Sequence, residues 1–128
     1  MIYVSGPING RLAGNLPAFR FAERELVELG HEVVVPHDVA PHEHAGECPV
    51  GYAEPHSVDF PEHTSTACFI RGDLRALLDC DAIYMLRGWE RSVGARLEFD
   101  VAATSGLHVV YQAPLVPVDF YASLVRSS

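Results

Sequence analysis

Two carboxylates, Glu98 and Asp73, each stand near the expected start of a helix. The positive end of a helix dipole favours the ionised form of a carboxylate in the first turn. An ionised carboxylate can attack an electron-poor carbon or stabilise an oxocarbenium-like centre, while a second carboxyl group with a raised pKa donates a proton. Each side chain could instead only stabilise its own helix. If the fold brings both carboxylates to one end of a sheet, the pair therefore predicts a site in which one carboxyl group acts as an acid while the other stays charged.

Two glycine-containing loops offer places for a phosphate, because backbone N–H groups and a helix start bind anions. One loop holds Ser92 and Gly94 and precedes the helix of Glu98. Ser92 could also serve only as an N-cap, although Ala95 stands where a capping box has Glu or Gln. The other loop follows the first strand and lacks a dinucleotide fingerprint. Its candidate contacts are Ser5, Gly6, Ile8, Asn9, Gly10 and Arg11.

Three further side chains are candidates at the same end of the fold. His37 directly follows the second expected strand, which places it at the ligand end of a parallel sheet. Trp89 lies in the loop before Ser92, and Tyr3 lies within the first strand. Either aromatic ring could stack on a base or could simply pack in the core.

The basic, cysteine and histidine content excludes several other chemistries. All nine basic residues are arginine, so a Schiff-base lysine and the lysine of a nucleotide phosphate loop are excluded. The net charge of −8 argues against a nucleic-acid binder. Cys48, Cys68 and Cys80 lack C-x-x-C spacing, and the seven histidines match no zinc pattern. No metal or cofactor is expected, although a metal-binding regulatory domain built on the histidine-rich loop stays an alternative.

Strands and helices alternate along the chain, which predicts an α/β fold: a Rossmann-like parallel sheet with helices on both faces. The expected strands lie at 2–4, 32–35, 82–86 and 107–111. The expected helices lie at 15–29, from about 70 to 78, at 95–105 and at 120–125. Ligands of such sheets bind at the carboxyl ends of the strands, where the candidate loops fall.

The length fits a single domain spanning residues 1–128, with an irregular His- and Pro-rich loop at about 36–68. The start has no signal-peptide pattern, and no segment has the length of apolar sequence that crosses a membrane. We therefore expect a soluble, cytoplasmic protein without a membrane partner.

The segment from Asp73 to Ala103 resembles the nucleoside 2-deoxyribosyltransferase superfamily. The resemblance rests on an Asp-Leu helix start, on a strand that begins near Asp81, and on the Ser-x-Gly-x-x-x-Glu element that ends at Glu98. The opening IYVSGPINGR is similar to the family's first strand and loop, with Tyr3 at the position of its active-site tyrosine. The segment 37–40 resembles the loop after the second strand.

This resemblance implies an N-glycosidase that acts on a nucleoside 5′-monophosphate, with Glu98 as nucleophile, Asp73 as proton donor and Tyr3 orienting Glu98. A serine at Ser92 is typical of the family's 2′-deoxynucleoside 5′-phosphate N-hydrolases, whereas its transferases carry aspartate there. Pro7 departs from the hydrolases, which have a phosphate-binding serine at that position. The resemblance also implies a homodimer. The alternatives are a nucleoside 2′-deoxyribosyltransferase and a non-catalytic nucleotide-binding module.

Overall fold

The computed structural model describes residues 1–39 and 66–113. Most of the histidine-rich loop expected at 36–68, and the helix expected at 120–125, lie outside these residues. Within them, no helix is long and apolar enough to cross a bilayer.

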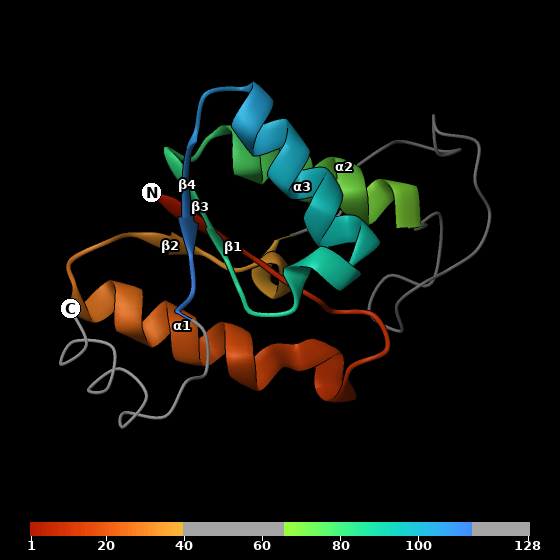
Figure 1. Cartoon of the computed structure of the whole chain (residues 1–128), viewed down its shortest axis with the longest axis horizontal. Coiled ribbons are helices and arrows are strands. Elements are labelled where there is room, and N and C mark those ends of the chain that lie inside the picture. The colour runs from red at the N-terminus through yellow and green to blue at the C-terminus, as the bar shows by residue number, and fades with distance from the viewer. Residues whose placement is uncertain (40–65, 114–128) are drawn as a thin grey trace, which may run out of the picture.

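The core of the fold is a parallel sheet with helices on both faces, which confirms the α/β prediction (Figure 1). Its strands are β1 (Ile2–Ser5), β2 (Val33–Val34), β3 (Ala82–Met85) and β4 (His108–Tyr111), in the order β2-β1-β3-β4. After β1 the chain forms β2 on one side of it, and later it returns to form β3 on the other side. The carboxyl ends of β1 and β3 therefore flank the point where the strand order reverses, which is where such sheets bind ligands.

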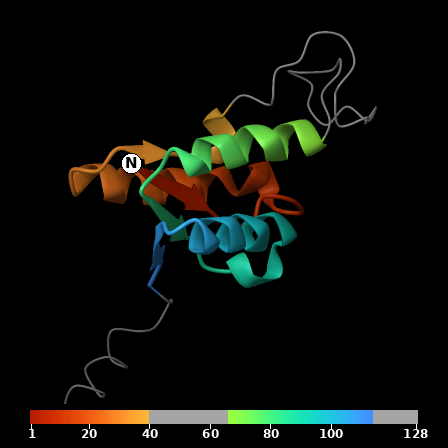
Figure 2. The same cartoon turned by 90° about the horizontal axis from the view of Figure 1, so that it is seen from above.

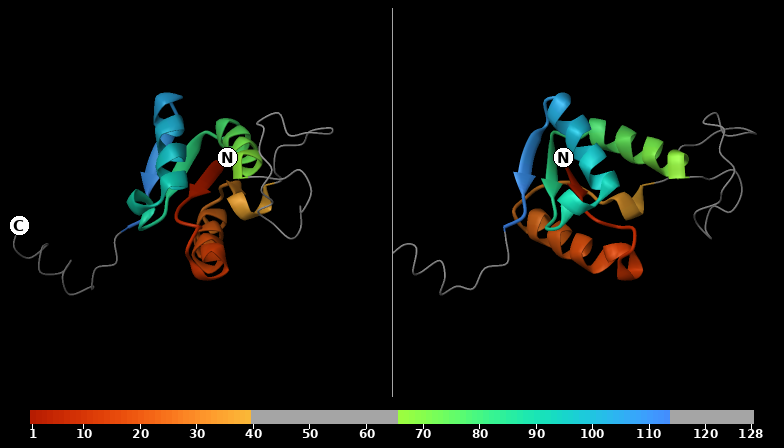
Figure 3. Two further views of the ribbon diagram at one scale, coloured as in Figure 1. Left: turned by 90° about the vertical axis from the view of Figure 1, so that its right-hand side faces the viewer. Right: turned by 45° about the vertical axis from the view of Figure 1, so that its right-hand side comes forward.

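The helices form two layers. Helix α1 (Leu16–Glu28) covers one face of the sheet, while α2 (Thr66–Leu78) and α3 (Val93–Thr104) cover the other (Figure 3). From above, α2 and α3 run over the same face (Figure 2). Helix α1 buries Phe19, Ala22 and Leu26 at spacings of three and four residues, the pattern of an amphipathic helix.

Strand β1 contributes to both layers. Its residues Ile2 and Val4 belong to the core cluster beneath α1, whereas Tyr3 belongs to the cluster beneath α2 and α3. Ser5 is fully buried on the same side as Tyr3, because side chains two residues apart share one face of a strand. A strand buried on both faces is what a central position in a parallel sheet requires.

Several predicted boundaries were wrong. Helix α3 begins at Val93 rather than at 95, because Ser92 caps it. Helix α2 begins at Thr66, inside the stretch expected to be irregular. The loops also contain short 3-10 turns, and strand β2 has only two residues. The turns span Leu12–Asn15, Pro36–Asp38 and Trp89–Arg91.

Candidate active site

Glu98 projects from the second turn of α3 onto strand β1, where two hydroxyl groups bind it. The Tyr3 hydroxyl donates to Oε2 of Glu98 at 2.5 Å, and the Ser5 hydroxyl donates to Oε1 at 2.7 Å. Both donors come from one face of β1, since they are two residues apart. Each carboxylate oxygen thus has one short hydrogen bond, and the orientation of the group is fixed.

Burial and hydrogen bonding act in opposite directions on Glu98. Burial raises the pKa of Glu98 above its ordinary value, and the hydrogen bonds from Tyr3 and Ser5 oppose that rise because they favour the ionised form. The pKa of Tyr3 is raised by burial and by the charge of Glu98. Tyr3 therefore remains a neutral phenol that can donate to the carboxylate throughout the physiological pH range.

Asp73 lies on α2, close enough to Glu98 to respond to its charge. Burial, and then the negative charge of Glu98, raise the pKa of Asp73 to about 7. At neutral pH a large fraction of Asp73 is therefore protonated. The structure brings together a carboxylate held by two donors and a carboxylic acid able to release a proton near pH 7, the arrangement that glycosidases use.

The start of α3 lies beside this pair. Ser92 is the N-cap residue, and its hydroxyl oxygen accepts a hydrogen bond from the backbone N–H of Ala95 at 3.2 Å. The first N–H groups of a helix have no acceptor within it. A Cβ at Gly94 would meet no atom within 4 Å, so the surface there is open. Glu98 lies four residues beyond Gly94, about 6 Å along the helix axis.

Arg11 reaches the loop that leads to α3. A Cβ built on Gly88 would lie 3.2 Å from an Nη atom of Arg11, and Gly88 has a φ of +88°. A side chain at Gly88 would thus be strained and would crowd the guanidinium. Gly88 begins the 3-10 turn that ends at Ser92. Among the described residues, Arg11 forms no ion pair, so its charge is available to an anion.

The rest of the first loop divides into packed and exposed residues. Gly6 lies against Leu86, so closely that a Cβ at Gly6 would come within 2.8 Å of the Leu86 Cβ. Ile8 packs against the core cluster beneath α1. Asn9 and Gly10 are exposed. The exposed candidates of this loop are therefore Asn9, Gly10 and Arg11.

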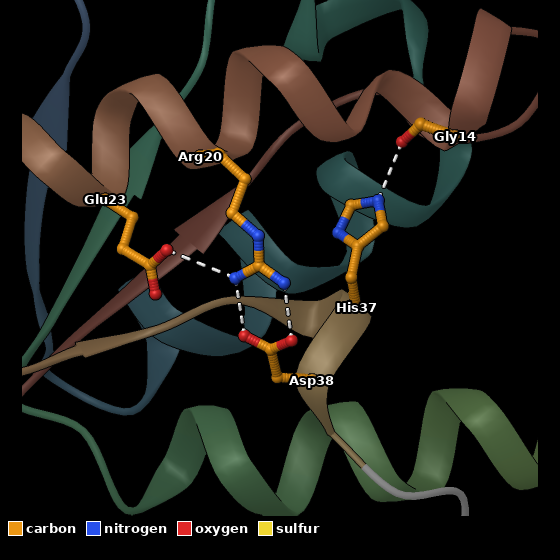
Figure 4. A network of polar contacts seen from close by, with 5 residues as sticks. All are labelled: Gly14, Arg20, Glu23, His37 and Asp38. Carbon is orange, nitrogen blue, oxygen red and sulfur yellow. Dashed lines mark hydrogen bonds and ion pairs between the residues drawn. The ribbon is translucent and has the colours of Figure 1, made fainter.

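His37 is engaged with the protein rather than with open space. Its Nε2 lies 2.8 Å from the carbonyl oxygen of Gly14 and donates to it, and its ring meets Phe19 edge-on at 4.6 Å (Figure 4). Ala13 and Asn15, on either side of Gly14, have positive φ values that non-glycine residues rarely adopt. His37 thus holds a strained turn at the start of α1.

The sequence reasoning missed an ion-pair network beside His37. Arg20 on α1 donates to both carboxylate oxygens of Asp38 at 2.6 Å and also pairs with Glu23 at 3.1 Å (Figure 4). The guanidinium lowers the pKa of Asp38. Of these contacts, only the pair of Arg20 and Glu23 could be inferred from the sequence, because residues three apart on a helix are neighbours. The network ties the start of the loop after β2 to α1.

Trp89 packs against α3 through Phe99, the residue that follows Glu98. Its ring stacks on Phe99 with centroids 4.7 Å apart, and Tyr111 lies 6.1 Å from it. The described residues contain no group of three or more His, Cys, Asp or Glu side chains that could hold a metal ion. Most of the histidine-rich loop lies outside them.

No curated protein matches the chain. A family model described as a domain of unknown function, DUF4406, matches residues 1–111. The match includes every strand and helix described above and all the candidate site residues. The chain therefore belongs to the DUF4406 family.

Proposed function

We propose that the protein is an N-glycosidase that cleaves the base from a nucleoside 5′-monophosphate. The observation that carries the proposal is the pairing of Glu98, whose oxygens accept from Tyr3 and Ser5, with Asp73, whose pKa is about 7. A carboxylate with only a structural role needs neither two short hydroxyl donors nor a half-buried acidic neighbour that makes its ionisation less favourable. The chain's resemblance to the nucleoside 2-deoxyribosyltransferase superfamily supports the same reading.

The proposed reaction has two steps. Ionised Glu98 attacks C1′ of the sugar, and the bond between C1′ and the base nitrogen breaks as Asp73 transfers its proton to the departing base. Water then attacks C1′ of the glycosyl-enzyme, Asp73 takes up a proton from that water, and Glu98 is released as a carboxylate. Tyr3 and Ser5 orient Glu98 and supply hydrogen bonds that favour its charged form.

The phosphate would bind at the start of α3. Arg11, the hydroxyl of Ser92 and the first N–H groups of the helix carry the positive charge and donors that this group requires. The axial distance of about 6 Å between Gly94 and Glu98 suits a sugar lying between phosphate and nucleophile. Arg11 takes over the contact that is lost because Pro7 has no hydroxyl or N–H to donate.

The test is base release from a panel of ribo- and deoxyribonucleoside 5′-monophosphates, with the matching nucleosides as controls. We expect release that requires the phosphate, and that falls by about 100-fold or more in Glu98→Gln and Asp73→Asn. Glu28→Gln, a change at an exposed glutamate on α1, is the matched control and should keep full activity. Release that persists in Glu98→Gln would refute the assignment of the nucleophile.

Two other outcomes lead to the alternative functions. Productive exchange when a free base is added would identify a deoxyribosyltransferase. Nucleotide binding without release, unchanged in Glu98→Gln, would identify a non-catalytic binding module.

The phosphate contact has its own test. Arg11→Met should raise the KM for a monophosphate substrate while leaving any residual turnover of the nucleoside unchanged, since only the former carries the charge that Arg11 meets. An equal effect on both substrates would show that Arg11 acts on the fold of the loop and not on the phosphate.

A homodimer belongs to the same proposal, because members of the superfamily that the chain resembles assemble with a neighbour completing each site. Light scattering across a range of protein concentrations would test it, with twice the monomer mass as the expected result.

A further inference from the structure

A cavity opens at the carboxyl ends of β3 and β4, with a volume of about 280 Å³. Trp89 and Tyr111 provide its aromatic surface, Arg87, Glu90 and Gln112 provide its polar groups, and Gly88 leaves its side open. Its size lies just below the range of pockets that hold drug-sized ligands, so it fits a single small ring system.

The cavity is separate from the Glu98 site. Ser5, Met85 and Tyr111 occupy the same register across β1, β3 and β4, so their side chains share one face of the sheet. Fully buried Met85 stands between the other two. Two strand spacings of about 4.8 Å put Tyr111 about 10 Å from Ser5. A ligand in this cavity would not touch the hydroxyl groups that hold Glu98.

The aromatic wall is built to present a flat surface. Phe99 stacks behind Trp89, with centroids 4.7 Å apart and planes inclined by 29°, and this fixes the indole ring. Tyr111 is inclined to Trp89 by 33° and remains 55% exposed, so its ring is accessible to a planar ligand. A heteroaromatic ring stacks favourably on such a surface whatever hydrogen-bond donors and acceptors it carries on its edge.

The polar wall is fixed as well. Gln112 is anchored through its backbone N–H, which donates to Met85, and its side-chain oxygen accepts from the Arg87 N–H at 2.9 Å. That bond leaves the amide NH2 of Gln112 to donate elsewhere. The Arg87 guanidinium donates to the carbonyl of Ala113 through one nitrogen and retains further donors. Glu90 is an exposed acceptor on the same wall.

From this combination we propose that the cavity binds a free planar heterocycle that carries both a carbonyl oxygen and an N–H group on its edge, such as cytosine or uracil. The ring stacks on Tyr111 beside Trp89. Its carbonyl oxygen accepts from Gln112 or Arg87, and its N–H donates to Glu90. The site stands on its own geometry and does not depend on the proposed hydrolysis.

Trp89 is the only tryptophan in the chain and lines this cavity, so its fluorescence reports on a ligand bound there. Titration of the full chain with cytosine and with uracil should quench that emission to saturation. Benzoate, which is planar but has no N–H group, is the ligand control and should bind more weakly than either base. Tyr111→Ser should weaken binding of cytosine by about 5- to 100-fold, the range found when one aromatic partner of a base is removed. Phe21→Ser removes a comparably exposed ring on α1 and should have no effect.

Four results would overturn the inference. The first is the absence of saturable quenching by either base. The second is equal quenching in wild type, Tyr111→Ser and a second variant, Gln112→Ala, all shown to be folded by circular dichroism. The third is a blue shift of Trp89 emission that grows with protein concentration alone, which would assign the cavity to a contact between two copies. Glu98→Gln separates the two proposals: loss of quenching there would place the base at the Glu98 site instead.

Discussion

Replacing Asp73 with asparagine should make the protein more stable at alkaline pH, even though the same change should abolish activity. Burial and the charge of Glu98 raise the pKa of Asp73 from 3.8 to about 7. Between these two pH values the unfolded chain gives up the proton of Asp73 while the folded chain keeps it. The wild type therefore loses stability as pH rises from about 4 to about 7, and this loss is constant above that range.

The magnitude follows from the size of the pKa difference. At about 1.4 kcal/mol for each pH unit, the change from 3.8 to about 7 corresponds to about 4 kcal/mol. Asp73 is partly exposed, and water screens its repulsion from Glu98, so we expect about half of that value. Asparagine carries no proton that responds to pH and is not subject to this loss.

Urea unfolding at pH 4 and pH 8 measures the effect, since the midpoint and slope give the free energy of unfolding at each pH. The stability of Asp73→Asn relative to wild type should be about 2 kcal/mol higher at pH 8 than at pH 4. Asp100→Asn, at an exposed position on α3, is the matched control and should show no such difference. A relative stability of Asp73→Asn that is the same at both pH values would show that Asp73 ionises normally, and the case for it as a proton donor would fail.

Three other changes test the remaining contacts. Ser5→Ala removes a hydrogen bond that lowers the pKa of Glu98, so the acidic limb of the pH–rate profile should move to higher pH; an unmoved limb would mean that the bond does not influence the carboxylate. Ser92→Ala should lower the stability measured by thermal unfolding by about 1 kcal/mol, because α3 loses its N-cap. Ser92→Asp should keep the cap and the stability, but its charge should raise the KM for a monophosphate. Equal KM values for wild type and Ser92→Asp would argue against a phosphate at this position. Arg20→Ala should cost about 1 kcal/mol or less, and less still at high salt, because Arg20 and Asp38 are 38% and 53% exposed; a loss above about 3 kcal/mol would show a structural role beyond the pair.

The sheet and its helices could be predicted because the spacing of apolar residues indicates each element and the turn residues mark where it ends. The expected helix at 15–29 is observed as Leu16–Glu28, and the expected strand at 107–111 as His108–Tyr111. The start of α3 was misplaced because Gly94 was taken for a loop residue. In the structure Gly94 lies in the first helical turn, where glycine is tolerated, and Ser92 provides the cap.

The surroundings of the candidate residues could not be predicted from spacing. His37 follows β2 as expected, but nothing in the sequence indicates that its ring reaches the carbonyl of Gly14. The left-handed backbone at Ala13 also goes against the preference of alanine, so the residue type does not predict it. Ser5 was expected to bind substrate, and the structure adds a hydrogen bond from its hydroxyl to Glu98 that spacing does not indicate.

Strand β1 limits how this molecule can change. Its odd-numbered positions, Tyr3 and Ser5, hold the carboxylate, and its even-numbered positions, Ile2 and Val4, fill the core under α1. Loss or gain of one residue within the strand would exchange the two sets, sending valine to the carboxylate and the hydroxyl groups into the apolar core. An insertion here would thus remove both the site and the fold at once, while the outer loops can lengthen without either effect. New specificities in this fold would therefore have to arise in the loops beyond the strand ends, with β1 itself left intact.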